Sequence, residues 1–97
     1  MRIIKRGTLK SFWEKHTAAK GALETWYHVA RKGKWSNFNE IRQTFGSADV
    51  IAGNREVFNI RGNSYRLVVK IHYNTQTIYI RFIGTHAEYG KIDAETM

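Results

Sequence analysis

The sequence predicts an α+β fold in which helices lie on one face of a mainly antiparallel sheet. Two helical stripes come first, and three strand patterns joined by short turns follow them. Helices and strands that occur in separate runs are typical of α+β proteins, because the helices then collect on one side of one sheet. The chain has 97 residues, enough for one core, so residues 1–97 are expected to form a single domain.

The N-terminal third predicts a short strand and two amphipathic helices. Residues 2–5 are the strand candidate. Residues 9–16 place their apolar side chains on one helical face, with Thr8 as the expected N-cap. Residues 18–32 repeat this pattern after Thr17. The apolar positions of the two stripes are Leu9, Phe12, Trp13 and His16, then Ala19, Ala22, Leu23, Trp26 and Ala30.

A third, shorter helix is expected over residues 38–45. Asn37 is the N-cap candidate, and Glu40 stands at the capping-box spacing from it. Gly33 is expected to end the preceding helix as a C′ residue. Residues 47–53 are expected to form a loop or a short extended segment.

Three strands are expected over residues 55–61, 65–72 and 77–83. Gly62-Asn63 and Asn74-Thr75 supply the turns, with a positive φ expected at Gly62 and Asn63. Side chains alternate along a strand, so each strand offers one apolar face to a core. The polar residues expected together on the opposite face are Asn59, Arg61, Arg66, Lys70 and Arg81. Because an unpaired cation is costly to bury, this face is expected to be open to solvent or to a polyanion.

The last strand and the segment after it complete the predicted fold. Strict alternation places Ile83 with Arg81 on the open face and Phe82 on the core face. A short helix or helical turn is expected over residues 86–94.

The charge balance favours a polyanionic partner such as RNA, DNA or an acidic protein. The chain has 16 Lys and Arg residues against 8 Asp and Glu residues, a net charge of +8. Simple solubility is the alternative explanation. Arg31, Lys32 and Lys34 cluster at the end of the second helix, where interaction with the helix dipole and contact with phosphate account for them equally well.

Several classes of protein are disfavoured. The absence of cysteine excludes disulfides and thiolate zinc sites, and the four histidines show no metal-binding spacing. No apolar run approaches membrane-spanning length, and the N-terminus lacks the pattern of a signal peptide. A cytoplasmic protein is therefore expected.

A cationic sheet face attracts a phosphate backbone, but cleavage of RNA needs further groups. The 2′-hydroxyl must lose a proton, the phosphorane charge must be stabilised, and the 5′-oxygen must gain a proton. Histidine and tyrosine can transfer protons, and arginine can hold a phosphorane through two hydrogen bonds. His86 and Tyr89 follow the last strand three residues apart, so on a helix they share a face. A purely structural role is the alternative for a single histidine at this place.

Two segments, FNIRGNSYRLVVKI (58–71) and IYIRFIGTHAEYGKI (78–92), resemble the HigB branch of the RelE/HigB ribonuclease toxins. The segments RIIKRGTLKSFWEKH and ALETWYHVARKGKW are similar to the same branch, so the resemblance covers nearly the whole chain. GNSYR and THAEY are its most specific parts.

This resemblance implies a microbial-RNase-like RelE fold with a curved sheet. It also implies a type II toxin–antitoxin toxin that cleaves mRNA on the ribosome through attack of the 2′-hydroxyl, with no metal and no cofactor. A helix-turn-helix (HigA-like) antitoxin would neutralise the toxin and would alone contact operator DNA. Contacts of the toxin with ribosomal RNA are implied as well.

The resemblance also assigns roles to individual residues. Arg66 matches the arginine of the family's tyrosine-arginine strand motif, which stabilises the scissile phosphate. His86 matches a position after the last strand where relatives carry a catalytic Arg or His, and Tyr89 falls close to a C-terminal catalytic Tyr. The residues implied to bind RNA are Asn59, which stands where some relatives carry Lys, together with Arg61, Lys70, Arg81 and Lys91.

One residue departs from the family's pattern. HigB-like sequences usually read His-x-x-Tyr-Asp, whereas Gly90 follows Tyr89 here. Because glycine supplies no carboxylate and loosens a helix, the hypothesis is that Gly90 weakens the toxin. Two non-enzymatic alternatives remain at this point: a nucleic-acid-binding module that uses the basic sheet face, and an interaction protein whose basic face docks an acidic antitoxin.

Overall fold

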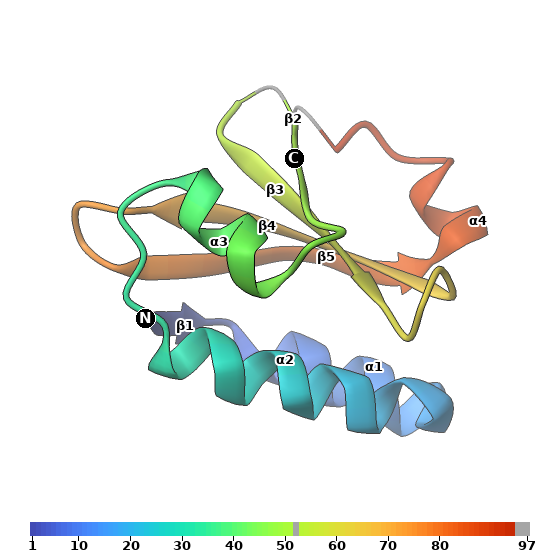
Figure 1. Cartoon of the computed structure of the whole chain (residues 1–97). Helices are drawn as coiled ribbons and strands as arrows, with labels where there is room; N and C mark the ends of the chain where they lie inside the picture. Colours follow the sequence, from blue (N-terminus) through green and yellow to red (C-terminus); the bar gives the residue numbers. More distant parts are fainter. Residues whose placement is uncertain (52, 95–97) are drawn as a thin grey trace.

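The computed structural model, which describes residues 1–51 and 53–94, confirms the predicted α+β architecture. Figure 1 shows helices α1 and α2 on one side of the sheet, with α4 at its far end. The elements in chain order are β1 (Arg2–Ile4), α1 (Arg6–Lys15), a 3₁₀ turn (Thr17–Ala19), α2 (Lys20–Lys32), α3 (Phe38–Thr44), β2 (Asp49–Ile51), β3 (Arg55–Ile60), β4 (Tyr65–His72), β5 (Thr77–Thr85) and α4 (His86–Tyr89).

The sheet has five strands in the order β1-β5-β4-β3-β2. The β2–β3, β3–β4 and β4–β5 pairs are antiparallel, and β1 pairs in parallel with β5. Strand β4 has the bounds that the sequence predicts, and β2 occupies the segment that was expected to be a loop or a short extended stretch. The mainly antiparallel prediction is therefore confirmed.

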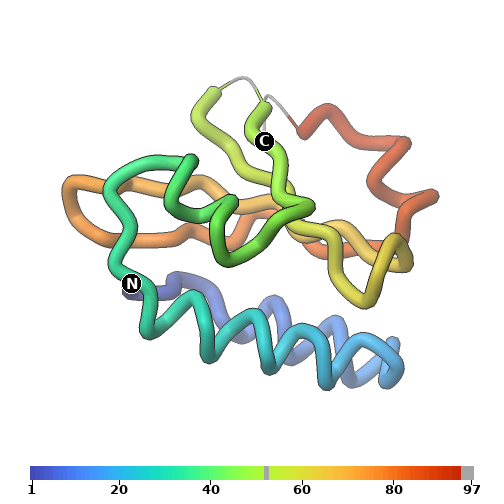
Figure 2. Tube along the Cα trace, viewed as in Figure 1, coloured from blue at the N-terminus to red at the C-terminus, as the bar shows by residue number. Residues whose placement is uncertain are grey.

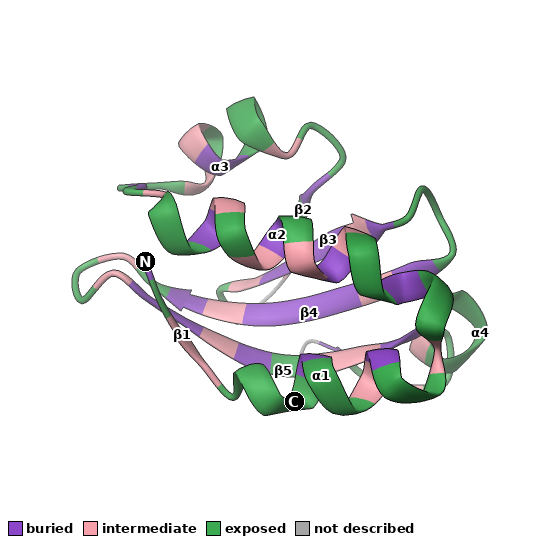
Figure 3. Ribbon diagram, turned by 90° about the horizontal axis from the view of Figure 1, so that it is seen from below, coloured by how far each residue is buried: buried purple, intermediate pink, exposed green. Residues whose placement is uncertain are grey.

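Helices α1 and α2 lie side by side across one face of the sheet (Figure 3). Their apolar stripes pack on the side chains of β3, β4 and β5 that point toward them. Trp26 lies edge-on to Phe58 with ring centroids 5.4 Å apart, and Phe45 lies edge-on to the same ring at 5.1 Å. The tryptophans of the two predicted apolar stripes are buried there, with Trp13 8% and Trp26 2% exposed.

The N-terminal helix begins earlier than the sequence predicts. Lys5 adopts a positive φ of 71°, which turns the chain directly from β1 into α1. The helix therefore starts at Arg6, and Thr8 lies inside its first turn instead of capping it. Gly33 does end α2, but with an extended backbone. Glycine is needed there because a Cβ would lie 2.4 Å from the ring of Trp35.

A β-bulge changes which residues of β5 face the helices. Val68 pairs with Phe82 and Val69 pairs with Ile80, so Arg81 is the extra residue of β5. Beyond the bulge the alternation shifts by one residue. Ile83 packs with the core under the helices and Phe82 packs on the opposite face, so the prediction for these two residues was wrong.

The face of the sheet opposite the helices is only partly open. The chain after β5 returns over this face, on the side away from α1 and α2 (Figure 2). There it forms a second apolar cluster, here called the C-terminal cluster, which buries the middle of the face. Its members are Val57, Val68 and Ala94, with Ile51, Phe82, Tyr89 and Ile92 packed against them. The expectation of an open face is therefore wrong at the centre, because Val57, Val68 and Phe82 give this face its own apolar patch.

Candidate active site

Arg66 lies on the face of the sheet opposite α1 and α2, between Asn59 on the neighbouring strand and the ring of Tyr89. It stands opposite Asn59 of β3 and Gly84 of β5 in the sheet register. Its Nη1 donates a hydrogen bond to the Oδ1 of Asn59. Its guanidinium carbon lies 6.0 Å from the centre of the Tyr89 ring. The partly buried guanidinium is therefore held by Asn59 and Tyr89 together, an arrangement suited to presenting its remaining donors to a phosphate.

Helix α4 carries the other two predicted catalytic residues. Its capping box is complete: the Thr85 Oγ1 accepts from the Glu88 backbone N–H at 3.2 Å, and the Thr85 backbone N–H donates to the Glu88 Oε1 at 2.7 Å. The hydrogen bond from the Thr85 backbone N–H, followed by interaction with the Thr85 hydroxyl, lowers the pKa of the Glu88 carboxyl. The helix covers four residues only, shorter than the predicted segment 86–94.

The start of α4 is tied to the turn before β4. The His86 backbone N–H donates to the Ser64 carbonyl at 3.3 Å. The His86 side chain is exposed, and Tyr89 is half-buried against the C-terminal cluster. The sheet and α4 thus bring Arg66 and Tyr89 together, with an exposed His86 on the same short helix.

Lys70 and Arg81 lie on the same face but beyond the C-terminal cluster. Lys70 is four residues from Arg66 on β4, which corresponds to about 13 Å along the strand. Lys70 stands opposite Tyr79, and the Arg81 guanidinium carbon lies 5.8 Å from the centre of that ring. The His72 ring lies edge-on to Tyr79 with centroids 5.1 Å apart. The sequence analysis did not propose a role for Tyr79 or His72, although strand alternation places both on the same face of the sheet as Lys70.

The other two predicted RNA-binding residues lie off the sheet. Arg61 is exposed, with a positive φ of 52°, in the turn after β3 instead of in the strand. Gly62 shares this conformation and Asn63 does not, so the predicted turn geometry is displaced by one residue. Arg61 also borders a pocket of about 280 Å³ lined by α2. Lys91 is exposed just after α4, where its backbone N–H donates to the Glu88 carbonyl at 3.1 Å.

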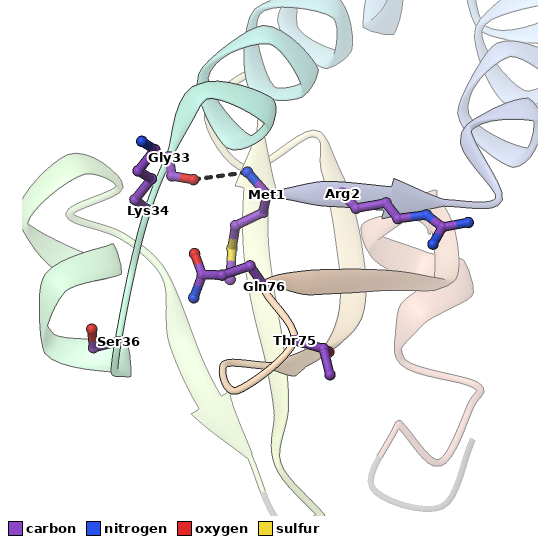
Figure 4. Close-up of a pocket in the computed structure, with 7 residues that line it drawn as sticks. All are labelled: Met1, Arg2, Gly33, Lys34, Ser36, Thr75 and Gln76. Atoms are coloured by element: carbon purple, nitrogen blue, oxygen red, sulfur yellow. Dashed lines mark hydrogen bonds between the residues drawn. The ribbon is translucent and has the colours of Figure 1, made fainter.

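A pocket of about 520 Å³ lies where the N-terminus meets the end of α2, away from Arg66 and α4 (Figure 4). The Met1 ammonium donates to the carbonyls of Ala30, Arg31 and Gly33, at 3.2, 2.7 and 2.7 Å. Carbonyls at the end of a helix lack the usual helical partners, although that of Ala30 also accepts from the Gly33 N–H at 3.2 Å. The ammonium therefore caps the C-terminus of α2. The pocket is therefore part of a structural contact.

Within residues 1–51 and 53–94, no group of three or more His, Asp or Glu side chains is arranged to hold a metal ion. Across the same residues, none of the helices combines the length and the apolar character that crossing a membrane requires.

Comparison with known proteins decides the family. The sequence profile of the HigB_toxin family, described as the RelE-like toxic component of a toxin-antitoxin system, matches residues 19–92. The chain belongs to this family. It is 31% identical over 91 residues to the mRNA interferase toxin HigB of Escherichia coli strain K12, in an alignment that covers 92% of this chain and 88% of the relative. It is 26% identical over 94 residues to the mRNA interferase HigB of Escherichia coli O6:H1, which covers 95% of this chain and 91% of the relative.

Gly90, the residue where this HigB family member departs from the expected His-x-x-Tyr-Asp, does not need to be glycine on steric grounds. Its backbone has φ −64° and ψ −15°, which any residue adopts. A Cβ there would lie 3.5 Å from the Ala87 carbonyl oxygen and 3.8 Å from that of His86, both ordinary contacts.

The net charge of this HigB family member is concentrated in residues 1–34, which form β1, α1 and α2. Residues 1–34 hold nine cations against two acids, whereas residues 35–97 hold seven against six. The nine cations are all exposed: Arg2, Lys5, Arg6, Lys10, Lys15, Lys20, Arg31, Lys32 and Lys34; the two acids are Glu14 and Glu24. Segment 1–34 therefore carries +7 of the net +8. The sequence interpretation emphasised the sheet cations, but most of the net charge lies in residues 1–34, and α1 and α2 carry six of the nine cations there.

Proposed function

We propose that residues 1–97 act as one RelE/HigB-like domain, the toxin of a type II toxin–antitoxin system, and cleave mRNA as an endoribonuclease. The observation that carries this proposal is the arrangement of Arg66, hydrogen-bonded to Asn59 and packed on Tyr89, beside the short helix that presents His86. The membership of the HigB toxin family supports it, as do relatives named mRNA interferase.

The reaction follows from the groups that this site supplies. The 2′-oxygen of the RNA attacks the adjacent phosphorus as the bond to the 5′-oxygen breaks, which leaves a cyclic phosphate and a free 5′-hydroxyl. His86 and Tyr89 are the two proton-transfer groups, one for the 2′-hydroxyl and one for the leaving oxygen. Arg66 stabilises the extra negative charge of the phosphorane. These groups are sufficient for both proton transfers and the charge, so the proposed reaction uses no metal ion.

The remaining predicted RNA-binding cations extend the site along the RNA. Lys70, Arg81 and Lys91 offer charge to flanking phosphates, and Arg61 does so from the turn after β3. Asn59 takes a different role from the one predicted, because its amide oxygen is occupied by Arg66. It is a positioning residue for that guanidinium.

Two partners complete the proposed function. The mRNA is cleaved on the ribosome, in the cytoplasm, with ribosomal RNA contacts made by the basic surface. A helix-turn-helix antitoxin of the HigA type neutralises the toxin and carries the contact with operator DNA. The toxin–antitoxin description of the family supports the existence of an antitoxin.

The test is induced expression of the chain, with cell growth and mRNA 5′ ends as the readouts. We expect growth arrest and new mRNA ends, both lost with His86→Ala and Arg66→Gln. Loss of a proton-transfer group or of a charge-stabilising group should each lower cleavage about 100-fold or more. Gln43→Ala, at an exposed polar position on α3, is the control and should behave like the parent chain.

Other outcomes would contradict the proposal. If purified protein binds RNA with equal affinity in the parent and His86→Ala forms, and neither form produces new ends, the chain is a binding module. If Arg66→Gln weakens only a complex with the antitoxin, the sheet face is a protein-docking surface.

A further inference from the structure

A pocket of about 290 Å³ lies between the end of α1 and the short helix α4. Figure 3 shows the end of α1 and helix α4 at the same end of the sheet. Glu88 of α4 lines this pocket and is two residues after His86, so a nucleotide next to the scissile phosphate is within its reach. The proposed cleavage reaction uses none of the lining residues. Beside Glu88 these include Thr8, Ser11, Phe12, Lys15 and His16.

His16 gives the pocket an ordered aromatic wall. Its ring stacks on that of Phe12 with centroids 4.3 Å apart and 19° between the planes. The buried Tyr65 ring lies edge-on to His16 at 6.0 Å and edge-on to Phe12 at 5.5 Å. Ile83 of β5 adds an apolar surface to the same pocket. A ring that two neighbours already hold in place loses little freedom on binding, and aromatic rings of this kind stack on nucleobases.

Glu88 is the acidic group of the pocket, and Lys15 is an exposed cation beside it. The Thr85 backbone N–H lowers the pKa of Glu88 most, and the charges of His16 and Lys91 lower it further, so the carboxyl is ionised at neutral pH. Its Oε1 accepts from the Thr85 N–H at 2.7 Å, but each carboxylate oxygen can accept more than one hydrogen bond. Glu88 can therefore accept two hydrogen bonds from a ligand while it still caps α4.

These groups favour a nucleobase with two adjacent N–H donors. Guanine presents its N1–H and its N2 amine side by side on the Watson–Crick edge, which matches a carboxylate that accepts two hydrogen bonds. Adenine and cytosine place an acceptor nitrogen next to their amine, and uracil has one N–H between two carbonyls, so each would direct a lone pair at the negative charge. The hydroxyls of Thr8 and Ser11 can donate to the O6 of guanine, and Lys15 can pair with a phosphate.

We propose that the pocket between α1 and α4 is a base-recognition site, which receives a guanine next to the cleaved bond and gives cleavage its sequence preference. His16 stacks on the base, Glu88 accepts from its N1–H and N2 amine, and Lys15 pairs with the neighbouring phosphate. Glu88 is thus a specificity-determining residue as well as the cap of α4. The effect on cleavage rests on the proposed ribonuclease function, but binding of the base can be measured without cleavage.

The first test titrates the nucleoside monophosphates GMP, AMP, CMP and UMP into the full chain and follows the amide NMR signals of Thr8, Ser11 and Lys15. We expect GMP to bind about 5-fold more tightly than the other three, the low end of what one bidentate contact supplies, because Glu88 is exposed. His16→Ala should weaken all four nucleotides alike, by about 5-fold, since stacking tolerates any base. His16→Phe keeps a ring and should bind within about twofold of the parent chain.

Glu88→Gln separates base recognition from the support of α4. Glutamine can still accept from the Thr85 N–H, so the capping box is retained. Its amide donates one hydrogen bond and accepts another, which matches adenine instead of guanine. We therefore expect the variant to prefer AMP over GMP by about 5-fold. Glu14→Gln is the matched control, because it removes the same charge from an exposed position of α1 that does not line the pocket, and it should keep the preference for GMP.

Mapping of mRNA ends is the second test. Ends made by the parent chain should share a guanine at one fixed position next to the cleaved bond, and ends made by Glu88→Gln should share an adenine there. A parent chain that prefers GMP but cuts no mRNA would refute the proposed function and leave the base-recognition site in place.

Other outcomes would overturn the proposal. Equal binding of the four nucleotides by the parent chain would show that no base is recognised. Equal weakening of all four in Glu88→Gln would reduce Glu88 to its capping role, and a change of preference in Glu14→Gln would make net charge the cause. Signal changes confined to Arg66 and Tyr89 would place the nucleotide on the sheet face. Loss of antitoxin binding in Glu88→Gln with an unchanged nucleotide preference would make the pocket a protein interface.

Discussion

The hydrogen bond from Arg66 to Asn59 gives the first prediction at the scale of single residues. Asn59→Ala removes the acceptor and frees the guanidinium, so we expect cleavage at saturating RNA to slow about 10-fold with KM nearly unchanged. Steady-state kinetics measure this split, and Asn63→Ala in the exposed turn before β4 is the control. A rise in KM with an unchanged maximal rate would make Asn59 an RNA contact, as the sequence alone predicted.

Glu56 gives a pH-dependent prediction. Its side chain is 2% exposed, and its Oε1 accepts from the Tyr73 hydroxyl at 3.2 Å. Burial raises the pKa of this carboxyl from 4.5 to about 7, although hydrogen bonds from Tyr73 and the Ile71 backbone act in the opposite direction. The folded state therefore binds this proton more tightly than the unfolded state. Its contribution to stability is complete below pH 4.5 and is lost as the pH rises through about 7.

We therefore expect Glu56→Gln to remove part of the decrease in unfolding free energy between pH 5 and pH 8. Denaturant titrations at a series of pH values measure this, with Glu14→Gln at an exposed position of α1 as the control. Parallel pH profiles for the parent chain and Glu56→Gln would show that Glu56 does not titrate in this range.

Sequence reasoning reached Arg66, His86 and Tyr89 through a motif, and their catalytic roles stay predictions. It did not reach the pairing of Asn59 with Arg66, because that contact depends on the register of β3 and β4. The turn at residues 61–64 sets this register, and its positive φ values lie one residue earlier than predicted. It also gave Glu56 no role, since nothing in a strand pattern shows that a carboxylate is buried next to a tyrosine.

At the scale of elements, the capping box of α4 links local stability to activity. A four-residue helix has little stability of its own, so the Thr85 and Glu88 pair is its main local support. Thr85→Ala should destabilise α4 by about 1 kcal/mol. Because α4 presents His86 and Tyr89, the cleavage rate should fall clearly while the free energy of unfolding of the whole protein changes little. Cleavage rates beside urea unfolding curves test this, with the exposed Thr25→Ala as control. Equal, proportionate losses in both measurements would contradict it.

Gly90 tests whether the sequence departure weakens the toxin. Because the backbone is helical and a Cβ meets only ordinary contacts, Gly90→Asp should fold normally. We expect stability within about 0.5 kcal/mol of the parent chain, since surface substitutions usually fall in that range. If the missing carboxylate limits the toxin, Gly90→Asp will arrest growth at lower induction, whereas Gly90→Ala will not. Identical growth curves for the three chains would refute the hypothesis.

The elements that the sequence predicted well are those with strong periodicity. Strand β4 and the two long helices follow their apolar patterns closely. The bulge in β5 could not be foreseen, because an extra residue in one strand leaves its alternation unchanged until the partner strand is known. The early start of α1 depends on the positive φ of Lys5, a conformation that lysine seldom adopts and that no pattern signals.

At the scale of the whole molecule, the sheet separates two apolar clusters, one that mainly stabilises the fold and one that positions α4. The core under α1 and α2 contains most of the buried side chains and joins the helices to the sheet. The C-terminal cluster is small and joins the segment after β5 to the other face, where it also contains Tyr89. Stability should therefore depend mainly on the first region, and the position of α4 on the second.

Two neighbouring residues of β4 can separate these tasks. Val68 and Val69 are each 0% exposed, but Val68 belongs to the C-terminal cluster and Val69 to the helical core. Val69→Ala should lower the unfolding free energy by about 2 kcal/mol, because the packed helices cannot close the cavity. Val68→Ala should cost less, about 1 kcal/mol, because the short segment above it can settle inward. Its effect on cleavage should nevertheless be larger, since that settling moves Tyr89 relative to Arg66. Urea unfolding curves and cleavage rates of the two variants test this. If Val69→Ala loses more cleavage activity than Val68→Ala when both are compared at the same folded fraction, the position of α4 does not depend on the C-terminal cluster.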